Sequence, residues 1–285
     1  REFDSEFNEY DGKLNQPKIK QQGLKYTFSA SQINRYARCP FLYFAERVLD
    51  VDPEDDTARR RMDVGIFYHN VIKVYYERCK DPRLPDIERL HDIFDNLAEY
   101  LDLTYLPPSL RVYALEELRQ VLERFIRHDA ENMARYNEVT GCILKPIMLE
   151  ERFVYKLDGD RAVITGIADR VDLEIDSDGH FTGRFIIYDY KKGSINGIKE
   201  CISGDDFQLP LYFSAFKNIL KEAFGIPHPE CLALLYYSIE KLNRDGIIRN
   251  DIKKALFEGK KGTKSTPEKA NMELVLSWAE QEAVK

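Results

Sequence analysis

Two acidic residues interrupt segments that otherwise have the pattern of buried β-strands. Residues 163–175 alternate with period two, and alternate residues of a strand face opposite sides of a sheet. Asp169 is the only charged residue in the apolar phase of this segment. The other phase, which we expect to be the wetter face, carries three charged residues: Arg170, Asp172 and Glu174. Since an unpaired buried carboxylate is costly, Asp169 should be paired, protonated or bound to a metal ion.

A second segment, residues 185–191, repeats this anomaly. Its apolar phase begins with Phe and Ile and is continued by Asp189 and Lys191. Residues 176–179, Asp-Ser-Asp-Gly, separate the two segments and are typical of a turn, so we expect a β-hairpin. Pairing of the two strands would bring Asp169 beside Asp189 and Lys191.

Two carboxylates and an ammonium group at one half-buried place suggest a cation site. Two like charges there would repel and raise one pKa unless a cation held them both. Mg²⁺ or Mn²⁺ suits such oxygen ligands, and the backbone carbonyl of Tyr190 could reach the same ion. The alternative is structural: a buried Asp–Lys ion pair, with the second aspartate at a strand end.

Such a set of residues could hydrolyse a phosphodiester. That reaction needs an activated water, stabilisation of charge on the phosphoryl oxygens and help for the leaving oxygen, and a metal ion held by carboxylates can supply all three. Lys191, about 7 Å from Asp189 along one strand face, could orient the attacking water and neutralise developing charge. We therefore predict Asp169, Asp189 and Lys191 as the catalytic residues.

A histidine on a predicted helix is a further candidate ligand. His69 ends the sequence Gly-Ile-Phe-Tyr-His, which opens a helix predicted over residues 65–79. A lone histidine on an apolar helix face is more often part of the core, but a neutral imidazole could complete the carboxylate site. The ligand role of His69 depends on the hairpin described above.

Polar residues on other predicted helices could contact a nucleic-acid strand. Gln208 and Tyr212 are four residues apart and share one helix face, from which they could contact the strand or brace the catalytic lysine. Arg35 and Arg38, with the arginine run 59–61, could contact phosphates. The plainer alternatives are an ordinary helix face and a solvated charged loop.

The secondary structure predicted around these residues is a helical region followed by strands. Ser29 to Gln32 forms a capping box for a helix to about Leu49, with a kink or break at Cys39-Pro40. Further expected elements are a charged loop at 50–64, a helix within 81–108, a helix capped by Ser109 and running to about Tyr136, strands at 146–157, 161–175, 183–191 and 230–240, helices at 205–224 (capped by Asp205 or Asp206) and 267–285, and a weakly patterned segment at 242–266. This order predicts an α/β fold with a small mixed β-sheet flanked by helices, and a helical insertion at about 80–140.

Composition narrows the class of protein. The chain has 285 residues, 44% of them hydrophobic, so it can bury a sizeable core; we expect an N-terminal arm or linker at 1–25 and a single domain over 26–285. A net charge of −7 restricts any nucleic-acid site to a local groove. Five widely spaced cysteines indicate a reducing, cytoplasmic setting. No apolar run approaches the roughly 18 residues of a membrane span, so we expect no membrane partner.

Taken together and in this order, the motifs resemble the RecB-like branch of the PD-(D/E)XK nucleases. The segments that carry the resemblance are Ser29 through Cys39-Pro40, Gly65-x-x-x-His69, Gly166-x-x-Asp169-Arg-x-Asp172, Asp189-Tyr-Lys191 and Gln208-x-x-x-Tyr212. The nuclease domain of AddB-type subunits of bacterial helicase–nucleases, which repair double-strand breaks, is the most similar type. The resemblance implies a restriction-endonuclease-like core, His69, Asp169 and Asp189 as metal ligands, and Lys191 as the catalytic lysine. Asp172 receives no metal role, because it faces away from Asp169.

The resemblance further implies a Mg²⁺- or Mn²⁺-dependent (exo)deoxyribonuclease of DNA recombination and repair. It would act on single-stranded DNA or DNA ends, beside a helicase or nuclease partner subunit. Two other interpretations stay open: a catalytically silent nuclease-like domain that binds DNA or a helicase partner, and a nuclease of CRISPR adaptation. Cys39 resembles a cysteine that helps to hold a 4Fe–4S cluster in AddB-type domains, but no cysteine follows Cys231 and four thiolates are needed, so we expect no such cluster in this chain.

Overall fold

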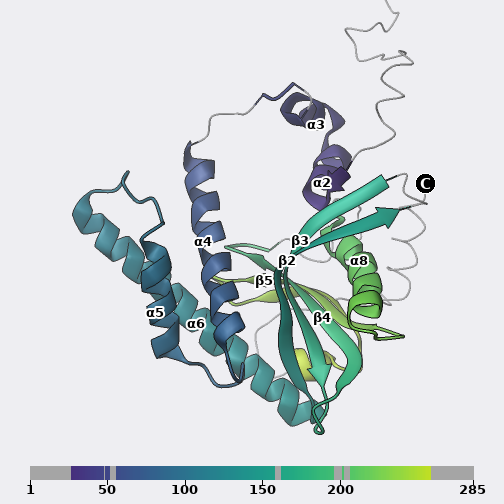
Figure 1. Ribbon diagram of the computed structural model, residues 1–285. Helices are drawn as coiled ribbons and strands as arrows, with labels where there is room; N and C mark the ends of the chain where they lie inside the picture. Colours follow the sequence, from purple (N-terminus) through teal and green to yellow (C-terminus); the bar gives the residue numbers. More distant parts are fainter. Residues whose placement is uncertain are drawn as a thin grey trace, which may run out of the picture.

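The computed structural model describes residues 27–257, except 48, 52–55, 158–161, 196–200 and 202–205. Within these residues, six strands form one mixed sheet with helices on both faces (Figure 1). The strands are β1 (Thr27–Ser29), β2 (Ile143–Leu157), β3 (Ala162–Ile175), β4 (Phe181–Lys191), β5 (Glu230–Ser238) and β6 (Arg244–Ile248). The helices are α2 (Ala30–Arg38), α3 (Pro40–Arg47), α4 (Asp56–Arg78), α5 (Ile87–Ala98), α6 (Pro108–Thr140), α8 (Gln208–Ala223) and α9 (Lys253–Phe257).

Strand β3 organises the sheet, because three other strands pair with it. The strand order is β1-β3-β4-β5-β6, and β2 pairs with β3 along its length. β4 runs antiparallel to the second half of β3, from Arg170 onward, whereas β1 runs parallel to residues 163–165. β4 therefore leaves β3 close to Asp169, at the place where the sequence predicts the site.

The sheet separates two hydrophobic cores. Helices α4, α5 and α6 cover one face, and α8 with α2 lies on the other (Figure 1). The long helix α6 buries apolar residues at helical spacing, among them Leu122, Phe125 and Ile126, against the first face. It ends at Gly141, whose φ of 75° is a left-handed conformation that glycine adopts without strain.

The expected strands and most expected helices are confirmed, with boundaries shifted by a few residues. Ser29 forms the predicted capping box: its hydroxyl accepts from the backbone N–H of Gln32, whose side chain accepts from the backbone of Ser29. The break at Cys39-Pro40 divides α2 from α3. The β3–β4 hairpin joins through a turn in which Asp176 accepts backbone hydrogen bonds.

Three expected elements are wrong in part. Residues 50–64 are not wholly a loop, because α4 begins at Asp56; charged residues such as Arg are good helix formers. Pro107, not Ser109, is the N-cap of α6, and Pro108 takes the first helical position, which proline tolerates. The segment after residue 242 contains β6 and α9.

Two expected segments, the arm at 1–25 and the helix at 267–285, lie outside the described residues. Among the helices that are described, none has the length and apolarity to cross a bilayer.

The expected wetter face of β3 is the most instructive correction. Arg170, Asp172 and Glu174 are all fully buried. Helices α4 and α6 cover this face and supply hydrogen-bond partners, including Tyr136, whose hydroxyl donates to Glu174. Buried charges persist only when they are paired and hydrogen-bonded, so this face is a paired polar layer and not a solvated one.

Candidate active site

A row of three carboxylates crosses three neighbouring strands. Glu150 and Asp169 lie between the β2–β3 pairs Leu149–Arg170 and Glu151–Ala168, and Asp189 follows Tyr188, which pairs with Arg170. Opposite residues of antiparallel strands project from the same face, with Cβ atoms about 5 Å apart. The backbone N–H of Tyr190 donates to Oδ2 of Asp169 at 2.5 Å, which ties the end of β4 to this row.

His69 reaches the row from helix α4. Its Nδ1 lies 2.9 Å from Oε1 of Glu150 and 3.4 Å from Oδ1 of Asp169, and one atom from each of the three side chains fits within 4.8 Å of the others. Burial alone would lower the pKa of His69, but hydrogen bonds to Asp169 and Glu150 outweigh it and raise the pKa to about 10. Without a metal ion the imidazole is therefore protonated, and a cation would have to displace that proton.

Asp189 is the most deeply buried of the three carboxylates. Burial raises its pKa to about 7, and the neighbouring charge of Asp169 adds to this, although Lys191 opposes it. Its Oδ1 accepts from the side-chain amide of Gln208. Its Oδ2 lies 2.5 Å from Nζ of Lys191, which is the buried Asp–Lys ion pair of the structural alternative stated above. In this structure the Lys191 ammonium is the cation that partners this oxygen.

Gln208 links the catalytic candidates to one another. It stands at the first position of α8, where its Oε1 accepts from Lys191 Nζ at 3.2 Å and its Nε2 donates to Asp189 and to the Tyr212 hydroxyl. Tyr212 is buried, and its ring packs edge-on against Phe153. This burial favours bracing of Lys191 over stacking on a nucleic-acid strand as the role of the Gln208–Tyr212 pair.

Helix α2 holds the start of α8 in place. Phe207, the N-cap, makes no side-chain cap of its own. Instead, the Asn34 side chain accepts from the Phe207 N–H at 2.7 Å and donates to Asp206 at 2.8 Å, while Asp206 accepts from the Gln208 N–H. These bonds satisfy the free N–H groups at the start of the helix. Asn34, 173 residues before Phe207, therefore helps to set the position of Gln208.

The other predicted nucleic-acid contacts lie on the outer side of α2. Arg35 and Arg38 are exposed, and Arg35 pairs with Glu46 of α3. The contacts found for them do not include the carboxylate row, so any strand they bind would extend from the site along α2. Of the arginine run at 59–61, only the backbone is described, as part of α4.

The glycine of the predicted Gly-x-x-Asp motif has a packing reason. A Cβ on Gly166 would lie 2.6 Å from the Phe153 ring and 3.1 Å from the Tyr212 ring. Both rings pack against β3 at this position, and the Tyr212 hydroxyl accepts a hydrogen bond from Gln208. Gly166 thus permits the close approach of α8 to the strand that carries Asp169.

The donor set suits a hard divalent cation. The carboxylates of Glu150 and Asp169 and the imidazole of His69 lie within one small volume, whereas the carboxylate of Asp189, on the next strand, is paired with Lys191. Mg²⁺ takes carboxylate oxygens, and Mn²⁺ accepts an imidazole as well. The backbone carbonyl of Tyr190 stays a predicted ligand.

Glu150 was missed by the sequence analysis, although a signal existed. If the β2–β3 hairpin is symmetric about the Asp-Gly-Asp sequence at 158–160, the residue opposite Asp169 is Glu150 or its neighbour. Glu150 also has a φ of 51°, a left-handed conformation rare for residues other than glycine. Backbone of this kind persists where the surrounding structure demands it, often at functional sites.

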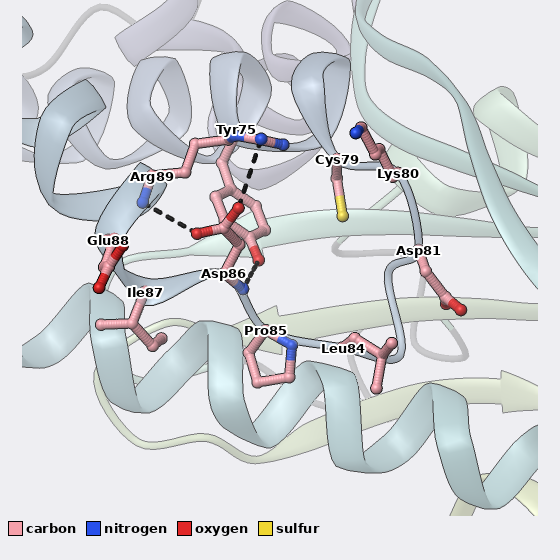
Figure 2. A pocket seen from close by; sticks show the side chains of 10 residues that line it. All are labelled: Tyr75, Cys79, Lys80, Asp81, Leu84, Pro85, Asp86, Ile87, Glu88 and Arg89. Carbon is pink, nitrogen blue, oxygen red and sulfur yellow. Dashed lines mark hydrogen bonds and ion pairs between the residues drawn. The ribbon is translucent and has the colours of Figure 1, made fainter.

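A pocket elsewhere in the fold offers no comparable chemistry. Figure 2 shows its lining residues at the junction of α4 and α5. The pocket has a volume of about 550 Å³. Arg89 pairs with Asp86 there, and the hydroxyl of Tyr75 accepts from the Asp86 N–H. Its lining residues include no histidine and none of the catalytic candidates.

None of the five cysteines is in a disulfide bond. Cys39 caps the start of α3, where its Sγ accepts from the Leu42 N–H at 3.4 Å. Cys201 and Cys231 are buried in the core on the α8 face. The thiol of Cys39 therefore has a local structural partner in this chain.

The mixed sheet with helices on both faces, and acidic residues and a lysine on adjacent central strands, define a nuclease fold of known type. The model of the PD-(D/E)XK nuclease superfamily matches residues 27–284, and the chain belongs to this superfamily. The six-stranded mixed sheet of the described residues agrees with the restriction-endonuclease-like core expected for such proteins.

The chain is similar to the AddB-type subunit of the ATP-dependent helicase/deoxyribonuclease of several bacteria. It is 28% identical to the Clostridium acetobutylicum protein over 279 residues, covering 87% of this chain and 23% of that protein. It is 28% identical to the Clostridium botulinum (strain Loch Maree) protein and 27% identical to that of Caldanaerobacter subterraneus, in each case over 80% of this chain and 20% of the relative. The chain thus spans about a fifth of the length of the curated relatives it matches.

Proposed function

We propose that this chain is a metal-dependent deoxyribonuclease domain that hydrolyses phosphodiester bonds in single-stranded DNA or at DNA ends, as an exonuclease. The observation that carries the proposal is the carboxylate row with its attached lysine: Asp169 and Asp189 on adjacent strands, each next to the pair Arg170–Tyr188, and Lys191 beside Asp189. Membership of the nuclease superfamily and similarity to deoxyribonuclease subunits support it.

In this proposal His69, Asp169 and Asp189 hold Mg²⁺ or Mn²⁺, with the Tyr190 carbonyl as a further ligand and Glu150 beside them. When bound, such an ion activates water and stabilises charge on phosphoryl and leaving oxygens.

Lys191 acts as a cation and not as a base. Burial alone would lower its pKa, but the charge of Asp189 outweighs burial and raises the pKa above the ordinary value for lysine. At neutral pH its Nζ is therefore an ammonium group that can donate a hydrogen bond to the oxygen of an attacking water or to a phosphoryl oxygen. Gln208 accepts from the same Nζ and so fixes its direction.

The proposal extends to the setting of the domain. By analogy with the named relatives, the chain would work in DNA recombination and repair in the cytoplasm, next to a helicase partner. We propose residues 26–285 as one nuclease domain, with a helical insertion at about 80–140 and an arm before it. Arg35 and Arg38, on the helix that also carries Asn34, would contact the DNA backbone.

Cleavage of labelled single-stranded DNA in Mg²⁺ or Mn²⁺ tests the proposed function. We expect the wild type to degrade the DNA and Asp189→Ala to lose this activity. The matched control is Asp178→Ala, which removes an exposed carboxylate from the β3–β4 turn and should keep the activity. If the wild type and Asp189→Ala are equally inert or equally active, the proposal is wrong.

Mn²⁺ binding should release more protons at pH 6 than at pH 8. In the metal-free protein Asp189 has a pKa of about 7, so it is protonated at pH 6 and largely ionised at pH 8. His69, with a pKa of about 10, is protonated at both values and contributes to both. The difference, up to about one proton per ion, is measured by titration calorimetry in buffers of different ionisation enthalpy. Asp189→Asn should remove the difference; an unchanged difference in that variant contradicts the assignment to Asp189.

A further inference from the structure

A fully buried charge cluster lies behind the carboxylate row, on the opposite face of β3. Arg170 donates from Nε and Nη2 to the two oxygens of Asp172, at 2.6 and 2.5 Å, and from Nη1 to Asp129 of α6 at 2.6 Å. The Tyr76 hydroxyl of α4 donates to the same Asp129 oxygen. All three charged residues are inaccessible to solvent or nearly so.

Tyr190 connects this cluster to the predicted metal ligands. Its hydroxyl accepts from Arg170 Nη1 at 3.2 Å, on the cluster side of the sheet. Its ring packs perpendicular to the ring of His69, with centroids 5.8 Å apart and planes at 89°. Its backbone N–H donates to Asp169, as described above. One residue thus contacts both ligands and is anchored at its far end by a guanidinium.

This geometry limits how His69 and Asp169 can move. A tyrosine side chain has two main torsions, and here the strand backbone fixes one end while Arg170 fixes the other. Arg170 is itself held from several directions: by two carboxylates, and by the Tyr76 and Tyr188 rings 4.6 and 4.7 Å from Cζ. The Tyr190 side chain that His69 contacts is therefore held rigidly.

Packing alone does not explain so many buried polar groups. Replacement of a buried ion pair by apolar residues of similar volume is often neutral or stabilising, so such a cluster is weak evidence for a contribution to stability. Groups behind metal ligands, in contrast, orient them and commonly change metal affinity when they are altered. The location directly behind His69 and Asp169 favours this second role.

We propose that Arg170 and Tyr190 are positioning residues that hold His69 and Asp169 in the arrangement a divalent cation requires. The inference rests on the proposed function, because it takes these two residues as metal ligands. It adds to that function a buried Asp129–Arg170–Tyr190 connection from helix α6 to the site.

The test compares two Tyr→Phe variants of one strand face. Tyr190→Phe removes the hydroxyl that Arg170 holds and should weaken Mn²⁺ affinity about tenfold in titration calorimetry. Tyr188→Phe is the matched control: Tyr188 lies two residues earlier, is equally buried and packs under the same guanidinium, but its ring meets Tyr237 and not His69. It should leave Mn²⁺ affinity unchanged. Excess Mn²⁺ should restore the DNA cleavage rate of Tyr190→Phe, which loss of folded protein would not allow.

A second variant and the wild type make the outcomes separable. Arg170→Lys keeps the charge but not the forked geometry, and it should weaken Mn²⁺ affinity at least as much as Tyr190→Phe. If the wild type binds Mn²⁺ and the two Tyr→Phe variants bind it equally well, the positioning role is overturned while the proposed function stands. A wild type that binds no Mn²⁺ overturns both.

Discussion

Lys191→Ala is expected to lower the turnover of DNA about 10²- to 10³-fold while Mn²⁺ binding is retained. The loss follows from removal of a preorganised cation that stabilises charge in the transition state. Metal binding is expected to survive because the substitution removes none of the proposed ligands, His69, Asp169 and Asp189. Single-turnover cleavage of labelled DNA at saturating Mn²⁺, with calorimetry of Mn²⁺ binding, measures the two effects separately.

Lys192→Ala is the natural comparison for this variant. Lys192 is the next residue, and its Nζ lies 4.0 Å from Glu240 at the partly exposed end of β4. Its removal should not change turnover. Equal losses for the two lysines would mean that general positive charge near the site matters and that Lys191 has no specific role.

Arg170→Leu is expected to lower the free energy of unfolding by about 3–5 kcal/mol. The substitution leaves Asp129 and Asp172 buried without their common partner. Burial already raises the pKa of Asp172 although Arg170 is present, so an unpaired Asp172 would take up a proton in place of keeping its charge. Urea denaturation of metal-free protein gives the change, provided that the slope with denaturant is unchanged.

An exposed arginine supplies the control for the ion-pair effect. Arg249 pairs with Glu230 and Asp251 at 2.8 Å each, but all three residues are substantially exposed. Arg249→Leu should cost less than about 1 kcal/mol, because solvent screens surface pairs. Similar losses for both arginines would contradict the view that the Arg170 cluster is desolvated.

The hairpin that carries the catalytic candidates could be predicted because its information is local. Period-two alternation assigns each residue of β3 and β4 to a face, and the Asp-Ser-Asp-Gly turn sets the pairing within narrow limits. The exact register could not be predicted, because a shift between Leu173 and Ile175 separates the pair Ile175–Phe181 near the turn from the pair Arg170–Tyr188 near the site. The capping box of α2 is equally local, since it joins Ser29 to Gln32, only three residues further along the chain.

Burial of the other face of β3 could not be predicted in the same way. A charged phase is solvated or buried according to what packs over it, and the covering helices α4 and α6 come from 56–78 and 108–140. Their Tyr76 and Asp129 look ordinary in sequence, as does Asn34, which caps a helix 173 residues away. Only the assembled fold shows that these residues pair with charges of other elements.

The sequence by itself determined that Asp169 lies on one strand of a hairpin and Asp189 and Lys191 on the other, because strand periodicity and a short turn act over few residues. The tertiary structure decided what surrounds them. His69 and Glu150 lie beside Asp169, and Gln208 hydrogen-bonds to Asp189. Arg170 lies on the opposite face of β3 and hydrogen-bonds to Tyr190. The physical reason is that each of these contacts joins separate elements, whose relative positions are set by burial of two cores on one sheet and not by local pattern.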